Sequence, residues 1–148
     1  IPKGTEMIAK TVGRQTNQVF ATLIESVKKC PDSTFGLSAG DSHESIGRIA
    51  MHIGDSIENA FMTASFREKW NTPVHGRAEC ILYLESCRDD LMVPFIETSD
   101  LASPDQQPEY FVSKLDRVMK ILRHVAHHTG ETGCLLRAMG IDEGKFIQ

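Results

Sequence analysis

The sequence predicts an all-α fold, a four-helix bundle that forms a single domain over residues 1–148. Four segments carry apolar residues every three or four positions, which is the spacing of one helix face. Three loops that contain proline or glycine separate these segments, and the alternating pattern of β-strands is nearly absent. Four amphipathic segments of about 20 to 30 residues joined by loops are what such a bundle requires.

The first predicted helix covers roughly residues 5–29, and a loop over residues 30–41 follows it. Its apolar face consists of Ile8, Val12, Val19, Leu23 and Val27. The second predicted helix opens at residues 41–45 and runs to about Phe66. Two residue pairs offer N-cap chemistry at its start, Asp41 with Glu44 and Ser42 with Ser45. Its apolar face consists of Ile46, Ile49, Ala50, Ile53, Ile57, Ala60 and Phe61.

A loop over residues 70–76 precedes the third predicted helix, roughly residues 77–95, which Pro94 should kink or soon end. Its apolar residues are Ile81, Leu84, Leu91, Met92 and Phe95. After a loop over residues 98–108, the fourth helix begins behind Pro108 and stops at Gly140. Its stripe consists of Phe111, Leu115, Val118, Leu122, Val125, Leu136 and Met139.

Composition excludes several classes of protein. Sixteen Lys and Arg against 20 Asp and Glu give a net charge of −4, which argues against a nucleic-acid binder. The longest stretch without a charged residue is ten residues, 15–24, about half of what a transmembrane helix needs, so no membrane partner is expected. The N-terminus carries no secretory signal pattern, and the four cysteines show no Cys-x-x-Cys spacing. A cytoplasmic location is therefore expected.

Histidines give the first chemical signal. Six are present, and three of them fall within the string Arg123-His124-Val125-Ala126-His127-His128. On a helix, His124 and His128 lie on one face with Cβ atoms about 5 to 6 Å apart, so both imidazoles can reach one ion. His127 lies roughly 100° away from His128 and would be a bystander or a hydrogen-bond donor behind the ligands.

Spacing alone leaves other interpretations open, because six histidines placed at random give about 0.2 such pairs. The alternatives are solvated surface histidines or a core histidine bonded to a carbonyl. A helical wheel places His124 and His128 away from the stripe of their helix, and His52 away from that of its own. A core histidine is therefore the poorer alternative. Either these side chains face water, or two helices meet in a second groove beside the main core.

Two other kinds of metal site fail on the sequence itself. Di-iron bundles need Glu-x-x-His motifs, and none of the eleven glutamates has a histidine three positions later. The His-Glu-x-x-His motif of zinc proteases also fails, because Gly47 stands where the second histidine should be. What remains is a three-histidine or mixed site with His52 as the third ligand, since the second helix has no other mid-helix histidine.

Two strings resemble the DinB/YfiT-like family of metalloenzymes. The first is SIGRIAMHIGDSIENAF, beginning at Ser45, and the second is LRHVAHHTGETGCLLRAMG, beginning at Leu122. The family pattern is a helix reading roughly Ser-Ile-x-x-x-x-x-His-Ile and, far downstream, His-x-x-x-His-x-Gly before a turn ending Leu-Arg-x-x-Gly. Both motifs occur here in the right order. The sequence departs from the family by Glu131 in place of a frequent Gln and by the extra imidazole of His127.

The resemblance implies a four-helix bundle, commonly a homodimer, with one divalent ion held by His52, His124 and His128. Zinc or nickel is the expected ion. Relatives with assigned chemistry include transferases and isomerases that use a low-molecular-weight thiol, while many members have no demonstrated activity. The resemblance therefore implies a small-molecule substrate and leaves open whether this chain is an enzyme.

Three imidazoles leave a fourth coordination position, in which an ion can lower the pKa of a thiol or a water toward neutrality. The expected chemistry is thiol-dependent transfer or hydrolysis. Asp55, one turn after His52, and Glu131, one turn after His128, are candidate catalytic groups that could orient a ligand or relay a proton. Both could instead be solvated or locally paired, Glu131 for example with Arg137.

Two alternatives to an enzyme remain at this stage. One is a non-catalytic helical module that dimerises or binds a partner and carries vestigial histidines. The other is a structural metal site, which requires four protein ligands.

Overall fold

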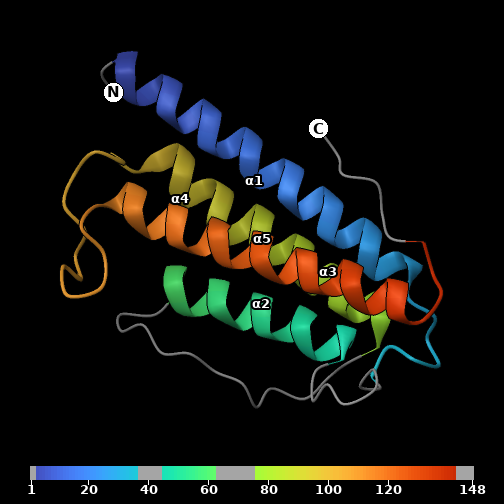
Figure 1. The fold of residues 1–148 in the computed structure, drawn as a ribbon. Coiled ribbons are helices and arrows are strands. Elements are labelled where there is room, and N and C mark those ends of the chain that lie inside the picture. The colour runs from blue at the N-terminus through green and yellow to red at the C-terminus, as the bar shows by residue number, and fades with distance from the viewer. Residues whose placement is uncertain (1–2, 37–44, 63–75, 143–148) are drawn as a thin grey trace.

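The computed structural model describes residues 3–36, 45–62 and 76–142. Its helices are α1 (Lys3–Lys29), α2 (Ile46–Phe61), α3 (Arg77–Ser86), the π-helical segment η1 (Cys87–Met92), α4 (Val93–Thr98) and α5 (Lys114–Ala138). Because α3, η1 and α4 follow one another without a break, they form one long rod, and the molecule is a bundle of four rods (Figure 1). The prediction of an all-α four-helix bundle is confirmed.

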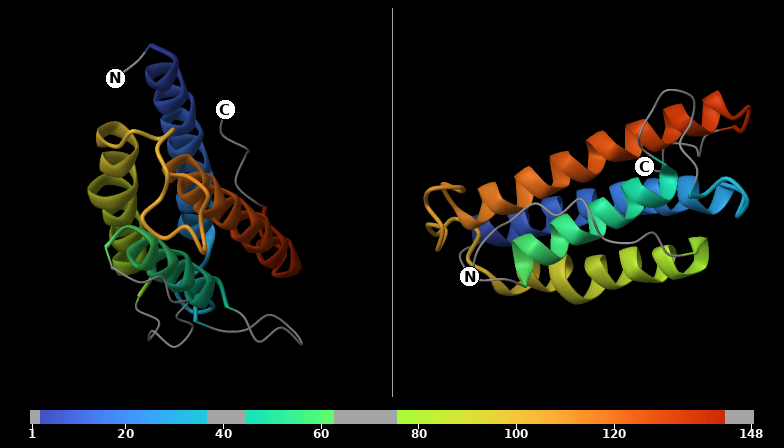
Figure 2. Two further views of the ribbon diagram at one scale, coloured as in Figure 1. Left: turned by 90° about the vertical axis from the view of Figure 1, so that its left-hand side faces the viewer. Right: turned by 90° about the horizontal axis from the view of Figure 1, so that it is seen from below.

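The four rods form a ring in which each packs on two neighbours. α5 lies between α1 and α2, and the rod of α3, η1 and α4 packs on the same two helices from the other side (Figure 2). The predicted apolar stripes of all four rods contribute to one buried core. Its fully buried members include Leu23, Val27, Ile46, Ile53, Ile57, Leu84, Val118 and Leu136. Among the helices described, none combines the length and the apolar character needed to cross a bilayer.

The N-cap of helix α2 is Ser45, the second member of one predicted pair, and not Asp41 or Ser42. The Ser45 side chain accepts a hydrogen bond of 3.0 Å from the backbone N–H of Arg48. A serine that accepts from the third residue of the helix satisfies one of the free N–H groups of the first turn. Asp41, Ser42 and Glu44 lie outside the described residues. The helix ends at Phe61, five residues before the predicted Phe66, which also lies outside them.

The third rod accommodates Pro94 by widening its turn. Proline has no N–H to donate, and its ring clashes with the carbonyl four residues earlier in a regular α-helix. Here the preceding residues form a π-helix, and the N–H of Val93 bonds to the carbonyl of Arg88, five residues back. A wider turn separates the ring from that carbonyl. The rod therefore continues to Thr98, and the prediction that it ends near Phe95 is wrong by three residues.

Helix α5 begins later than predicted, at Lys114 instead of directly after Pro108. Ser113 is its N-cap and accepts from the N–H of Asp116 at 3.1 Å, and the Asp116 carboxylate accepts from the N–H of Val112 at 2.9 Å. These two hydrogen bonds tie the first turn of α5 to the loop before it, with the carboxylate accepting from the residue that precedes the N-cap and not from the N-cap itself as in a capping box. Phe111, predicted to lie on the helix stripe, is therefore a loop residue and is buried. The helix ends before Gly140, as predicted, and that glycine has a φ of 76°.

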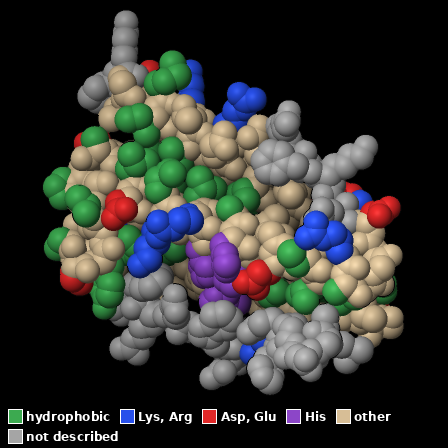
Figure 3. Space-filling view, in the orientation of Figure 1, with side chains coloured by type: hydrophobic (Ala, Val, Ile, Leu, Met, Phe, Trp, Pro, Cys, Tyr) green, Lys and Arg blue, Asp and Glu red, His purple; other side chains and the backbone are tan. Residues whose placement is uncertain are grey.

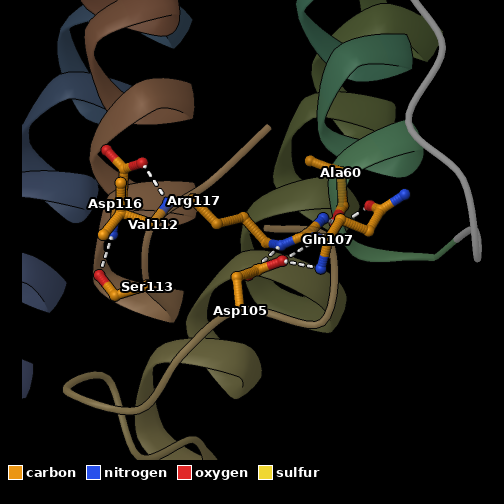
Figure 4. Close-up of polar contacts among 7 residues, drawn as sticks. All are labelled: Ala60, Asp105, Gln107, Val112, Ser113, Asp116 and Arg117. Carbon is orange, nitrogen blue, oxygen red and sulfur yellow. Dashed lines mark hydrogen bonds and ion pairs between the residues drawn. The ribbon is translucent and has the colours of Figure 1, made fainter. Parts of the chain in front are cut away.

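A buried arginine ties the start of α5 to the end of α2. Arg117 is 1% exposed and donates two hydrogen bonds to Asp105, of 2.8 and 2.7 Å, and one of 2.9 Å to the side-chain oxygen of Gln107 (Figure 4). It also donates to the carbonyl of Ala60 near the end of α2, and its guanidinium lies 4.3 Å from the ring centre of Phe111. The hydrogen bond from Arg117 holds the pKa of Asp105 below its ordinary value.

We expect Arg117→Met to lower the free energy of unfolding by about 3–5 kcal/mol, because it leaves the Asp105 carboxylate buried without its charged partner. Urea denaturation followed by circular dichroism measures this change. The double variant Arg117→Met with Asp105→Asn should lose less than the sum of the two single variants. Strictly additive losses would show that the two side chains do not depend on each other.

The same pair predicts how stability changes in acid. Because the pKa of Asp105 is lower in the folded chain than its ordinary value of 3.8, the unfolded chain takes up a proton first as the pH falls. The stabilisation is complete above about pH 4 and is lost below it. We expect the stability of the wild type to fall more steeply between about pH 5 and pH 2 than that of Asp105→Asn. Parallel pH profiles of the two proteins would contradict this assignment.

Candidate metal centre

Three histidine side chains from two helices meet between α2 and α5. Nε2 of His124 lies 2.9 Å from Nε2 of His52 and 2.8 Å from Nε2 of His128. The three ring centres are 4.5 to 4.8 Å apart, and the ring planes cross at 62° to 85°. The convergence of these residues, predicted from the sequence, is confirmed.

Burial distinguishes the two arrangements that the helical wheel left open. His52 and His128 are 3% and 7% exposed, so they do not face water, and His124 is half-buried. Of the two arrangements, solvated histidines are therefore wrong, and the three side chains lie between α2 and α5 with His124 nearest the surface. Histidine side chains reach the surface there, with Lys and Arg side chains on one side and an acidic side chain on the other (Figure 3). The cluster can thus be reached from solvent on one side.

The donor atoms fit a cation better than they fit each other. The Nε2 of a neutral imidazole has one in-plane position, occupied by either a hydrogen or a lone pair. Two Nε2 atoms approach that of His124, and a single position cannot serve both well. A cation between the three atoms would accept a lone pair from each. Tetrahedral coordination at about 2.0 to 2.1 Å places ligand nitrogens about 3.3 Å apart, so the rings would need to separate by only a few tenths of an ångström.

Electrostatics keep the donors in the protonation state that a metal needs. Burial, followed by the neighbouring His128 and His52, lowers the pKa of His124 to about 4. Burial also lowers the pKa of His128, although Glu131 opposes this shift. These two imidazoles are therefore neutral near pH 7, and neutral imidazoles are the form that binds metals.

Glu131 lies beside two of the histidines, and its predicted catalytic role remains a prediction. Its Oε1 is 3.5 Å from Nδ1 of His128 and 2.9 Å from Nε2 of His127. A carboxylate near Nδ1 favours the hydrogen on that atom and leaves the lone pair on Nε2. His127 thus lies behind the ligands, next to Glu131. Arg137, the alternative partner of Glu131, donates to the sulfur of Cys134 at 3.2 Å.

Asp55 points to another helix. It is 6% exposed, and its carboxylate accepts a hydrogen bond of 3.0 Å from the hydroxyl of Tyr83 on α3. The ring of Tyr83 lies on the backbone of Gly54, where an added Cβ would come within 2.2 Å of a ring carbon. Burial and nearby anionic groups raise the pKa of the Tyr83 phenol, so it remains a hydrogen-bond donor. Asp55 therefore joins α2 to α3, and its predicted catalytic role remains a prediction.

Sequence reasoning did not single out Tyr83. Its partner lies 28 positions earlier in the chain, and only the alignment of α2 with α3 brings the two together. No local pattern in the sequence carries that information.

Within the described residues, the donors that gather with His52 are those of His124 and His128, which makes three. A structural site would need a fourth protein ligand. Cys30, Cys80 and Cys87 are buried and form no disulfide, while Cys134 is exposed. Three ligands with access from solvent are the arrangement of sites that leave one position for a substrate or water.

No protein-family model and no curated protein matches this sequence. The case for a function therefore rests on the geometry of the three imidazoles and on the residues around them.

The contact between Glu131 and His128 leads to a prediction about metal affinity. We expect Glu131→Gln to weaken the binding of Zn²⁺ about 10- to 100-fold, because carboxylates behind a ligating histidine typically have an effect of that size. Competition with a chromophoric chelator measures the dissociation constant. Glu97→Gln, which removes an exposed carboxylate on α4, is the matched control and should bind as the wild type does. Equal affinity of the wild type and Glu131→Gln would contradict this role.

Proposed function

We propose that the protein binds one divalent metal ion through His52, His124 and His128 and is a metal-dependent enzyme that activates a thiol or a water. The observation that carries the proposal is the approach of two Nε2 atoms to that of His124, at 2.9 and 2.8 Å, from two different helices. Hydrogen bonding alone does not explain three buried or half-buried imidazoles that face one point.

The donor set indicates which ions fit. Three neutral nitrogen ligands suit zinc and nickel, the two ions we favour, and geometry and availability decide between such metals. When bound, a divalent ion in such a site lowers the pKa of a thiol or a water in its open position toward neutrality. We propose thiol-dependent transfer or hydrolysis of a small molecule, with a low-molecular-weight thiol as the cosubstrate in the first case.

The chain's own residues would prepare the site in three ways. The imidazoles of His52 and His128, both nearly inaccessible, keep water away from the protein side of the ion. Glu131, whose Oε1 lies 3.5 Å from Nδ1 of His128, would favour the hydrogen on that atom and so direct the lone pair of Nε2 toward the ion. The half-buried His124 lies on the side that solvent reaches, where a substrate would approach.

Membership of the DinB/YfiT-like family is part of this proposal. It is supported by the four-rod bundle and by the meeting of His52 with His124 and His128, the residues on which the resemblance depends. A homodimer and a cytoplasmic location belong to the same proposal. Three buried cysteines that form no disulfide suit a reducing compartment.

Metal content tests the proposal. Protein purified without an affinity tag should contain about one zinc or nickel ion per chain by elemental analysis, because three imidazoles from one chain complete the protein's share of the site. Replacing His52, His124 and His128 together by alanine should abolish binding. His127→Ala, which removes the exposed neighbouring imidazole, is the control and should keep the ion.

Chemistry is tested next by assaying thiol cosubstrates with electrophilic or hydrolysable substrates, with and without a chelator. Activity should disappear with the chelator and return with the ion. A chain that binds no metal and keeps its stability in the triple variant is instead a non-catalytic helical module, and the proposal is then wrong. Metal without any activity would reduce the proposal to metal binding.

A further inference from the structure

Beside the three histidines, two cationic residues of α5 line a shallow concavity. Its volume is about 380 Å³, and its wall is formed by Tyr110, Asp116, Met119, Lys120 and Arg123. Arg123 directly precedes His124, and Lys120 lies four residues before it. Four residues are about one helical turn, or about 6 Å along the axis, so Lys120 projects from the same face of α5 as His124, one turn earlier. Arg123 lies about 100° around the helix from His124 and meets Lys120 in the wall of the concavity.

Lys120 is held close to the site. Its side chain is half-buried, and its ammonium lies 5.2 Å from the ring centre of the buried Phe111. A charge held in this way can attract a ligand that reaches the ion.

The acidic groups nearby leave the concavity net positive. Asp116 is the one carboxylate in its wall, and it accepts a hydrogen bond from the backbone N–H of Val112. Two cations and one carboxylate give a net charge of about +1 at neutral pH. Glu131 lies on the opposite side of the histidines, beyond His128 along α5, next to His127. The concavity is thus locally positive, although the whole chain has a net charge of −4.

We propose that the thiol or substrate used at this centre carries a carboxylate, which Lys120 and Arg123 bind while its reactive end reaches the ion held by the histidines. This inference rests on the proposed function and adds to it the class of the substrate. A net charge of about +1 matches a monoanion better than a phosphate dianion, which is why we choose a carboxylate. The acidic side chain of Glu131 would repel the same group from the other side.

Three small thiols that differ in charge test this proposal. The protein is loaded with Co²⁺ in place of the native ion, and thiol binding is followed by the sulfur-to-cobalt absorption band. The probes are 3-mercaptopropionate, which is anionic, 2-mercaptoethanol, which is neutral, and cysteamine, which is cationic. The measured quantity is the ratio of dissociation constants of the neutral and the anionic thiol. Comparing this ratio between variants cancels the intrinsic basicity of each thiol.

We expect the ratio to favour the anionic thiol and to fall about tenfold in the double variant Lys120→Gln with Arg123→Gln, since two charge contacts near a protein surface have this order of effect. Raising the salt concentration should reduce the preference in the wild type. The control is Lys10→Gln, which removes one cation from α1, where Lys10 lines a different concavity. It should leave the ratio unchanged.

Each outcome has a distinct meaning. If cobalt binds and all thiols bind, but the ratio is the same in the wild type and the double variant, the carboxylate site is wrong and the metal centre stands. If the double variant no longer binds even 2-mercaptoethanol, Lys120 and Arg123 support the fold of the site and not a carboxylate, and the inference fails. Competition by inorganic phosphate that is stronger than competition by acetate would replace the carboxylate with a phosphate. If no cobalt binds, the proposed function fails and the inference fails with it.

Discussion

The antiparallel alignment of α2 with α5 is the constraint on which the site depends. Arg117 on α5 donates to the carbonyl of Ala60 on α2, and His124 on α5 meets His52 on α2. From the first contact to the second, the chain moves seven residues forward along α5 and eight residues back along α2. At about 1.5 Å per residue, these steps are about 10.5 and 12 Å, so both contacts fit a single register of the two helices. The buried guanidinium thus holds the helices in the position that brings the imidazoles together.

Charge is distributed unevenly along α5 around the three histidines, so one end of the candidate site is positive and the other is negative. The imidazoles of His124 and His128 have pKa values lowered mainly by burial, so the centre itself carries little positive charge near neutral pH. Along α5, Lys120 and Arg123 precede it and Glu131 follows it. A ligand with one negative charge would therefore be drawn to one end of the site. If the proposed ion is bound, the two ends would have different roles, with Glu131 acting on His128 and the cations acting on the incoming ligand.

Much of this arrangement is local and could be predicted from the sequence. The four apolar stripes place the helices, and the i,i+4 spacing places His124 and His128 on one face. His52 followed by elimination, because the predicted second helix has no other mid-helix histidine. The predicted fourth helix begins behind Pro108, but the N-cap of α5 is Ser113, whose side chain accepts from the N–H of Asp116. Phe111, predicted to lie on the helix, therefore lies in the loop under Arg117.

Contacts between helices could not be predicted in this way, because one sequence gives no register. The pairing of Asp55 with Tyr83 and that of Arg117 with Ala60 join residues far apart in the chain. The sequence predicts that Pro94 kinks or soon ends the rod, but not that a widened turn over Cys87–Met92 lets the rod continue past it. Local patterns thus identify which side chains are available for a site, and the packing of the rods decides which of them meet.

The buried histidine cluster lowers the stability of the folded chain in acid. Protonation of a buried imidazole whose pKa is lowered to about 4 costs free energy, so acid favours the unfolded chain in the range below the ordinary value of 6.5. Leucine or isoleucine at the same positions would remove this cost and extend the apolar core. A ligand that binds only the folded chain offsets it, because binding adds to stability as the ligand concentration exceeds its dissociation constant. A divalent cation is the ligand whose chemistry matches three converging nitrogen donors. A bound ion would therefore offset the free-energy cost of burying these imidazoles, and this would explain why the core contains histidines here instead of apolar residues.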